Sequence, residues 1–210
     1  MDLFVADKNL NKLGVLNDRT SLIWTRRYTK TGEFELHCPL TQHNLDFTQR
    51  GNIIYRADDT EAGFITYRNL DQDATGAEVI VAKGSFLTGY LNRRIIWGTE
   101  NINGAVEVAM RTLVNNNAIA PADSSRIIPN LILGTLKNYA ETANYQTSYK
   151  NLSEELENLS VLSALWHRVN LSIDAKQLIF EVCKGFDRTA GQSTNPRCIF
   201  SRDYNNILEQ

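Results

Sequence analysis

Two histidines and a cysteine near the N-terminus are the residues whose types and spacing could most readily support chemistry. His37 and His43 are six residues apart, and Cys38 directly follows the first histidine. A Cys–His pair can form an activated nucleophile, and the same side chains can bind a metal ion. However, strand alternation puts His37 on a polar face, opposite Cys38, and neither a carboxylate cluster nor a glycine-rich elbow accompanies them. We therefore expect no catalytic residue, cofactor or metal ion here.

Two acidic groups could in principle bind a hard cation, because calcium favours oxygen ligands gathered in one loop. The first group is Asp58, Asp59 and Glu61, and the second is Asp71 and Asp73. Neither group has the glycine-bearing spacing of a calcium-binding loop. We interpret both as solvated turns.

The remaining histidine and the three cysteines carry no recognisable ligand pattern. His167 follows Trp166 where a predicted helix passes into a strand, so we expect a partly exposed turn residue rather than a ligand. Cys38, Cys183 and Cys198 are odd in number, widely spaced and without CxxC pairing. This pattern argues against a zinc site or a disulfide framework and fits synthesis in a reducing bacterial cytoplasm.

Two arginine doublets, Arg26-Arg27 and Arg93-Arg94, are the remaining groups that could bind a charged ligand. The first doublet lies in a predicted hairpin, in which strand-like runs 21–28 and 33–38 meet at a glycine turn. Antiparallel pairing would bring it back towards two acids of the second run, Glu33 and Glu35. Phosphate binding needs more than such doublets. We therefore interpret both as structural ion-pairing groups.

Composition and motifs exclude several classes of function. A chain of 210 residues with 42% apolar and 22% charged residues is ordinary for a soluble globular protein of one large or two small domains. A net charge of -2 gives no global attraction to nucleic acid or anionic membrane. The sequence contains no nucleotide-binding glycine loop, no GxSxG and no glycosidase-like carboxylate pair. We therefore expect a non-enzymatic protein that does not bind nucleic acid.

No targeting or membrane-spanning segment is predicted. The N-terminus has an acidic second residue and reads as a first strand rather than a signal peptide. Nowhere do about 18 apolar residues follow one another, which is the length that a spanning helix needs.

The first half of the chain is predicted to be all β. Its alternating runs are short and are separated by turn residues, which favours a sheet that curls into a barrel or sandwich. We expect an antiparallel β-barrel-like domain over residues 1–98, with strands at 3–6, 12–16, 21–28, 33–38, 52–56, 63–69 and 78–83.

The second half, residues 99–210, is predicted to be an α+β domain. Helical spacing predicts a helix over 103–114, stopped by the Asn115-Asn116-Asn117 run, and Pro129 restricts the apolar run 127–133 to an edge strand or irregular structure. A second helix, 152–165, carries a leucine stripe and a capping box of Asn151 and Glu154. It precedes two alternating strands joined by the turn 174–177, so we expect the helix to pack on a hairpin sheet. The overall fold class is α+β.

The polar stretch 185–201 joins this hairpin to a final apolar patch and is too long for an ordinary turn. Long polar loops often contact partners. A disordered connector explains the same composition, and both interpretations stay open.

Several segments in order along the chain resemble the tail-hub and tail-tip proteins, related to baseplate hubs, of siphophages and prophages of Gram-positive bacteria. The matching pieces are a W-x-R-R-Y…G-E-F-E-L hairpin at 24–36, L-N-R-R-I at 91–95, G-F-D-R-T at 185–189 and I-F-S-R-D-Y-N-N at 199–206. They span nearly the whole sequence.

The resemblance implies a role in the virion tail. The family looks related to the central hub of contractile-tail baseplates, a trimeric ring with two tube-like β-barrels per subunit and α+β insertions between them. It implies a homotrimer, contacts with the distal tail and tape-measure proteins, and a first barrel ending near residue 97. Family chains usually continue past the last motif into more β structure, whereas this sequence stops at Gln210, so we expect a fragment or a short member.

We therefore expect a structural component of a phage tail tip or baseplate hub, part of a ring that connects the tail tube to the distal tip. Closed symmetric homo-oligomers are the usual way to build such rings. The candidate interface residues are charged side chains within the matching motifs: Arg26, Arg27, Arg93, Arg94, Asp187 and Arg188.

Two other classes of function stay open. A cell-wall hydrolase, or a tail protein associated with one, would need a cleft with a carboxylate of raised pKa or a zinc triad. A carbohydrate-binding module would place exposed aromatic side chains in a groove. Aromatic residues on strands more often belong to the core. The candidates are Trp24, Tyr28, Tyr55, Tyr67 and Trp97.

Overall fold

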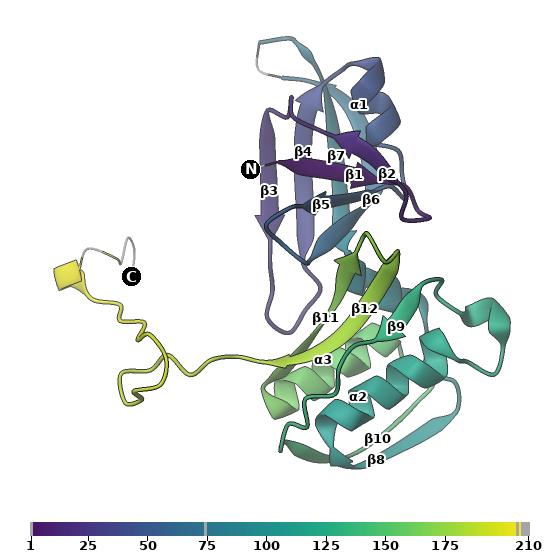
Figure 1. Cartoon of the computed structure of the whole chain (residues 1–210), viewed down its shortest axis with the longest axis vertical. Helices are drawn as coiled ribbons and strands as arrows, with labels where there is room; N and C mark the ends of the chain where they lie inside the picture. Colours follow the sequence, from purple (N-terminus) through teal and green to yellow (C-terminus); the bar gives the residue numbers. More distant parts are fainter. Residues whose placement is uncertain (1, 74, 205, 207–210) are drawn as a thin grey trace.

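The computed structural model describes residues 2–73, 75–204 and 206. Figure 1 shows a β-rich part formed by the first half of the chain, a part of helices and strands beneath it, and a C-terminal segment that runs away from both. The predicted α+β class is confirmed. Ala74, within the predicted loop 71–76, and Asn205, within the segment 199–206, lie outside the described residues.

The seven predicted N-terminal strands all form, and they build one antiparallel sheet with the order β2-β1-β5-β6-β7-β4-β3. The expected alternation is clearest in the fourth strand, where Phe34, Leu36 and Cys38 are buried and the residues between them are not. The bounds are β1 Leu3–Ala6, β2 Lys12–Val15, β3 Ser21–Thr25, β4 Glu33–Pro39, β5 Ile53–Arg56, β6 Ala62–Gln72 and β7 Glu78–Phe86.

The sheet of the predicted barrel-like domain does not close into a barrel, because β2 and β3 end the strand order without pairing with each other in the described part of the chain. Both edge strands are short, and none of their residues is fully buried. The sheet nevertheless curls strongly. Leu3 of β1 and Leu36 of β4, from opposite ends of the order, meet in one buried cluster with Ile54, Ile65 and Ile80.

A short helix that the sequence pattern did not predict, α1 (Gln42–Phe47), connects β4 to β5. Thr41 caps it by accepting a hydrogen bond from the Asn44 backbone N–H at 3.2 Å. The buried Asn44 side chain also donates to Asp18 and to the Pro39 carbonyl. Six residues are too few to show helical periodicity, which explains the omission.

The second half of the chain contains two small sheets and two longer helices. A parallel pairing of β9 with β12 completes a three-stranded sheet of order β11-β12-β9, and β8 pairs with β10. The elements are η1 Leu87–Arg93, β8 Thr99–Ala105, α2 Val106–Val114, η2 Asn115–Ile119, η3 Ser124–Arg126, β9 Leu131–Leu133, β10 Thr142–Ser148, α3 Leu152–Ser163, β11 Leu165–Ser172, β12 Gln177–Lys184 and η4 Arg202–Tyr204.

The helix predicted over 103–114 differs from the observed structure at both ends. Its first residues belong to β8, where Ile102 pairs with Tyr145, so the helical spacing of Ile102 and Val106 is a coincidence. The asparagine run does not stop the helix, which continues as a π-helical turn. Asn117 explains this, because its side chain donates to the Leu113 carbonyl and accepts the backbone N–H of Trp97.

The predicted leucine stripe of α3 is mostly buried. Leu152, Leu156 and Leu159 lie in the core, and Asn151 caps the helix as predicted. Leu162 is 65% exposed, and Leu165 is buried but starts β11. The helix ends at Ser163 because Ala164 adopts a left-handed backbone conformation, with φ of 56°.

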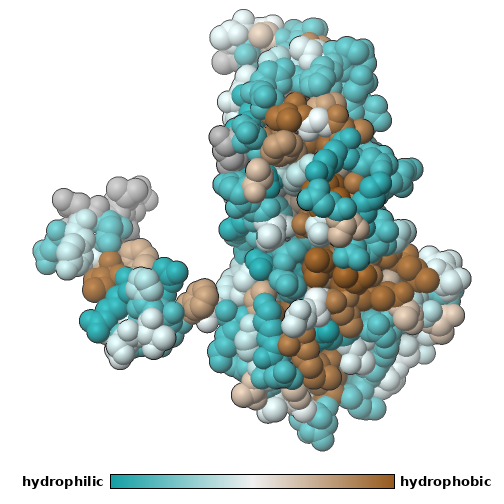
Figure 2. Space-filling view, viewed as in Figure 1, coloured by the Kyte–Doolittle hydropathy of each residue, from teal (hydrophilic) through white to brown (hydrophobic). Residues whose placement is uncertain are grey.

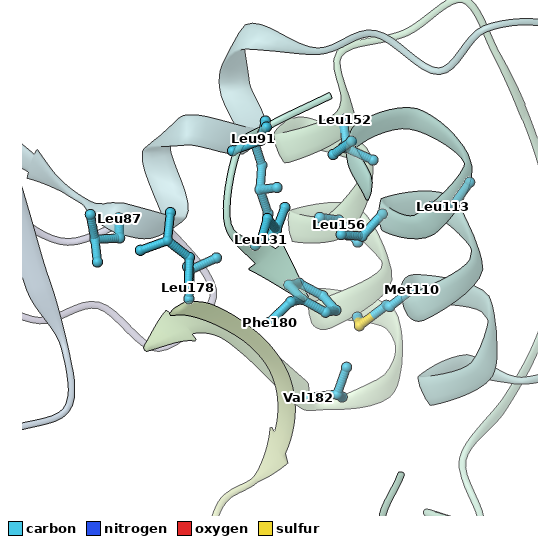
Figure 3. Close-up of a cluster of buried hydrophobic side chains, with 14 of the residues drawn as sticks. Leu87, Leu91, Met110, Leu113, Leu131, Leu152, Leu156, Leu178, Phe180 and Val182 are labelled. Atoms are coloured by element: carbon cyan, nitrogen blue, oxygen red, sulfur yellow. The ribbon is translucent and has the colours of Figure 1, made fainter. Parts of the chain in front are cut away.

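One buried cluster joins the curled sheet to the second half of the molecule. Figure 3 shows side chains of α2 and α3 facing Phe180 of β12, with Leu87 and Leu91 of η1 extending the cluster towards the sheet. Phe64 of β6 and Ile53 of β5 belong to the same cluster. Each buried leucine contributes roughly 1.5–3 kcal/mol, so this shared core fixes the two halves firmly together. No helix in the described part of the chain is long and apolar enough to span a membrane.

Candidate interaction site

The residues that suggested metal or nucleophile chemistry do not come together. His37 Nε2 lies 2.8 Å from a Glu35 oxygen, whereas the His43 ring packs on Phe47 with centroids 4.0 Å apart. Burial, with a smaller effect of Asp18, raises the pKa of the Cys38 thiol to about 11, so it is protonated at neutral pH. No group of three or more metal-ligating side chains occurs among the residues that the structure describes.

The prediction that His167 is a partly exposed turn residue is wrong. It lies inside β11, is 6% exposed, and its Nδ1 is 3.1 Å from the Ser160 hydroxyl oxygen. Burial lowers the pKa of His167 to about 4, so the ring is neutral at physiological pH. Ser160 is also fully buried. The pair therefore belongs to the packed interior rather than to a solvent-accessible active site.

The acidic group at 58–61 is only partly the solvated turn that we expected. Asp58 is exposed and pairs with Arg56 at 2.6 Å. The side chains of Asp59 and Glu61 are only 4% and 14% exposed, and both pair with Arg26. Burial raises the pKa of Glu61, with Arg26 opposing the shift. Long-range packing against Arg26, which local turn residues do not reveal, accounts for the difference.

The second acidic group behaves as predicted at Asp73, which forms a local exposed turn. Its carboxylate accepts hydrogen bonds from Thr75 and from the backbone N–H of Ala77. These contacts lower the pKa of Asp73, with the Thr75 side-chain hydrogen bond as the largest cause.

The first arginine doublet is fully occupied by contacts within the chain. Arg27 pairs with Glu33 at 2.6 Å, as predicted, whereas Arg26 reaches the 58–61 loop instead of Glu35. Glu35 pairs with Lys83 at 2.8 Å. The pairing of β3 with β4 explains why Arg26 does not reach Glu35. The paired part of β3 ends at Thr25, so both arginines lie beyond it.

The second arginine doublet has no ion pair with any carboxylate of the described residues, which corrects the structural ion pairs that we predicted for it. The Arg93 guanidinium lies over the rings of Tyr90 and Phe64, at 4.8 and 5.0 Å from their centroids. Arg94 donates hydrogen bonds to the backbone carbonyls of Arg93, Arg126 and Ile127. Both guanidinium groups are therefore held in place while their charges stay uncompensated.

A pocket of about 190 Å³ lies beside this doublet, where the β1–β2 turn, β5, η1, the loop before β9 and β12 meet. We call it the junction pocket. Its cationic wall is Lys8, Arg93 and Arg94, and its apolar wall includes Leu10, Ile128 and Leu178. Figure 2 shows apolar side chains gathered on the surface where the two halves of the molecule join. The composition of the pocket suits an anionic ligand that also carries an apolar group.

Of the residues that line the junction pocket, Arg93 and Arg94 were predicted from the sequence as interface residues, whereas Lys8 and Tyr90 were not. The spacing of Tyr90 and Arg93 is a signal that could have found the stacking, because residues three apart are neighbours on a helical turn. Nothing local to Lys8 reveals its place in the pocket, since the β1–β2 turn approaches η1 only through the tertiary fold.

The five aromatic candidates are dispersed over different elements. Trp24 packs on Phe86 with ring centroids 4.6 Å apart, and Tyr55 stacks on Phe4. Trp97 is 66% exposed and forms an edge contact with Tyr149. Of the remaining two candidates, Tyr28 lies against Trp166, and Tyr67 is half exposed on β6. The contact of Trp97 with Tyr149 was not predicted, because it joins residues far apart in the sequence.

The C-terminal segment after β12 leaves the body of the molecule (Figure 1). Asp187 accepts a hydrogen bond from the Thr189 backbone, and the Arg188 carbonyl accepts one from the Cys198 N–H. The Asp187 carboxylate and the Arg188 backbone are thus engaged locally, whereas the Arg188 guanidinium forms no ion pair within the described residues. Four of its apolar side chains are exposed: Phe186, Ile199, Phe200 and Tyr204.

The model of the Siphovirus ReqiPepy6 Gp37-like protein family matches residues 2–210, nearly the whole chain. No curated protein is significantly similar to the chain in sequence.

Three solved tail proteins share the fold. The prophage tail protein gp18 from Listeria monocytogenes EGD-e has a TM-score of 0.55 at 13% identity, covering 86% of this chain and 50% of that one. A tail protein from Neisseria meningitidis MC58 has a TM-score of 0.52 at 15% identity, and the match covers 85% of this chain and 49% of that one. The 43 kDa tail protein of prophage MuSo2 from Shewanella oneidensis has a TM-score of 0.50 at 12% identity, and the match covers 91% of this chain and 58% of that one. This chain thus spans about half the length of the first two proteins.

Proposed function

This chain belongs to the Siphovirus ReqiPepy6 Gp37-like protein family, and from this premise we propose that it is a non-enzymatic structural component of the tail tip or baseplate hub. It is a phage or prophage tail protein and forms part of the virion tail. The proposal adds a position within the tail, a ring of three copies, and contacts with the distal tail and tape-measure proteins.

The observation that carries the proposal is the continuous core between the curled sheet and the α+β half. The cluster that includes Phe64, Leu91 and Phe180 crosses from one half to the other. A subunit of a tail ring has to transmit load without hinging, and a close-packed apolar core resists such bending. The fold shared with three tail proteins over most of this chain supports the same role.

The candidate interface residues differ in how free they are to contact another chain. Arg26 and Arg27 form ion pairs within the chain, and Asp187 is engaged in its own segment. Arg93 and Arg94 present uncompensated charge at the junction pocket. Arg188 forms no ion pair either, but its guanidinium is not held by any contact within the described chain. We therefore assign the main intermolecular contact to the second doublet, whose guanidinium groups are held in place.

Immunogold labelling of intact virions tests the proposed position. Antibodies against this chain should label only the end of the tail farthest from the head. Labelling along the tube or at the head junction would overturn the tail-tip proposal. A reconstruction of the tail tip by cryo-electron microscopy would then count the copies, and any number other than three would overturn the trimer.

Binding of cell-wall carbohydrate is the second candidate function, favoured by one observation. Trp97 and Tyr149 are exposed in edge contact, and the Arg126 guanidinium lies 5.5 Å from the Trp97 ring centroid. Exposed aromatic faces beside polar groups can stack on sugar rings. Co-sedimentation with purified host cell walls tests this function. We expect binding that is lost in Trp97→Ala and kept in Tyr67→Ala, and equal sedimentation of both variants would contradict it.

A further inference from the structure

We infer that the junction pocket binds a peptide carboxylate of a neighbouring tail-protein chain, with an apolar side chain next to that carboxylate. The inference deepens the proposed structural role, on which it rests, by naming the chemistry of the partner. It follows from uncompensated positive charge, from the fixed geometry of that charge, and from the apolar wall beside it.

The positive charge of the pocket is not neutralised by any carboxylate of the described chain. Arg26, Arg27 and Arg56 each have a carboxylate partner, whereas Lys8 and Arg93 form no ion pair within the described chain. The nearest acid in sequence to Lys8, Asp7, directs its carboxylate to the amides of Asn9 and Asn11. An incoming anion would therefore find unpaired cations and would not displace an existing partner.

The two arginines of the pocket are already ordered. Arg93 is stacked on Tyr90 and Phe64, and Arg94 is held by carbonyls of the loop that follows η3. Ordering a long side chain on binding costs roughly 0.5–1.5 kcal/mol, and prior stacking removes part of that cost. An arginine fork can also bind both oxygens of a carboxylate at once.

Like-charge repulsion adds to the affinity of the pocket for an anion. Burial lowers the pKa of Arg94, and the neighbouring Arg126 and Arg93 lower it further. A bound carboxylate would offset both effects, because it supplies the opposite charge that the chain itself does not.

The apolar wall favours a peptide over a phosphate polymer as the ligand. Leu10, Ile128 and Leu178 line the same pocket as the cations, and all three belong to the buried core. A leucine-sized side chain would bury its surface there, at about 25 cal/mol per Å². A phosphate polymer such as a wall teichoic acid has no comparable apolar group. A volume of about 190 Å³ accommodates one side chain and its carboxylate rather than a folded element.

Titration of the isotope-labelled full chain, followed by NMR of leucine and isoleucine methyl groups, tests the ligand chemistry. The probes are the capped dipeptide acetyl-Leu-Asp-amide, its neutral match acetyl-Leu-Asn-amide, and glycerol phosphate. We expect saturable shifts at Leu10, Ile128 and Leu178 with the aspartate peptide, and much weaker effects with the other two. Equal shifts with the asparagine peptide, or tighter binding of glycerol phosphate, would overturn the inference.

Matched variants separate the pocket from general charge effects. Lys8→Gln and Arg93→Gln should each lower the affinity for the aspartate peptide by roughly three- to tenfold, because each removes one charge-assisted contact. Arg27→Gln, a charge of the same sign outside the pocket, should leave the affinity unchanged. Unfolding curves of all three proteins confirm that each variant is folded, and equal affinities of the three variants would contradict the assignment.

Light scattering then distinguishes two sources of the carboxylate. Self-association of the pure chain that is lost in Arg93→Gln identifies a second copy as the donor. A monomer that forms a complex only with a distal tail or tape-measure protein, again dependently on Arg93, identifies another chain. If Arg93→Gln assembles as well as the parent chain, both alone and with the distal tail or tape-measure protein, the inference is overturned. The tail-tip position would be unaffected, since immunogold labelling tests it separately.

Discussion

Arg26, which follows β3, and Glu61, which precedes β6, form an ion pair with the arginine Nε 2.9 Å from a Glu61 carboxylate oxygen. The same guanidinium pairs with Asp59. Next to this contact, the backbone of Glu61 pairs with Asn170 of β11, and the Leu171 N–H donates to the Thr60 carbonyl at 2.8 Å. The arginine thus neutralises two largely buried acids where the sheet meets the second half of the molecule.

Replacing Arg26 by alanine should therefore destabilise the fold by about 1–3 kcal/mol, because it leaves buried carboxylates without their counter-charge. Arg27→Ala is the matched control. Its ion pair with Glu33 is exposed on both sides and should contribute less than about 1 kcal/mol. Urea unfolding followed by circular dichroism measures both changes, and equal effects of the two variants would contradict this role of Arg26.

Local patterns predicted the fold where neighbouring residues determine it. The alternation of Phe34, Leu36 and Cys38 predicted a half-buried strand, and the spacing of Leu152, Leu156 and Leu159 predicted the buried face of a helix. These features depend on backbone periodicity, which any sequence displays directly.

Features that depend on distant contacts could not be predicted in this way. Nothing beside Arg26 shows that it binds the 58–61 loop, and nothing beside His167 shows that β11 buries it. The sheet closes into a barrel only if β2 pairs with β3. The sequence of neither strand shows whether the two will pair. The arginines of the junction pocket were identified from their motif, but the pocket needs five segments brought together by the tertiary fold.

His167 predicts a pH dependence of stability. Its pKa is lowered to about 4 in the folded protein by burial, against an ordinary value of 6.5. The unfolded state therefore binds more protons between these values, so stability is full above pH 6.5 and is lost as the pH falls towards 4. We expect a loss of about 2–3 kcal/mol between pH 7.5 and 4.5 from this residue.

Urea unfolding at several pH values measures this loss. His167→Gln removes the titrating group, so its stability should vary much less over the same range, although it starts from a lower value at pH 7.5 because the packing changes. An unchanged pH profile in His167→Gln would show that other groups cause the acid sensitivity.

Two leucines of α3 predict a sharp contrast within one helix. Leu156 is fully buried against the shared core (Figure 3), and its replacement by alanine should cost about 2–5 kcal/mol through lost burial and a cavity. Leu162 is 65% exposed, and Leu162→Ala should change stability by less than about 0.5 kcal/mol. Thermal unfolding of the two variants provides the comparison. A large cost at Leu162 would indicate that this surface packs against something in solution.

The second arginine doublet predicts a loss of assembly that is separable from a loss of fold. Arg93→Ala with Arg94→Ala removes two charges that no carboxylate of the described chain compensates, together with the carbonyl contacts of Arg94. Those contacts are worth about 1 kcal/mol each, so the double variant should still fold. Mixed with the distal tail and tape-measure proteins, it should elute as smaller species than the parent chain in size-exclusion chromatography with light scattering. Arg27→Ala should assemble normally, because its charge is engaged by Glu33. If the double variant forms rings as readily as this control, the doublet does not contribute to the interface, and the ring contact must lie on another face of the molecule.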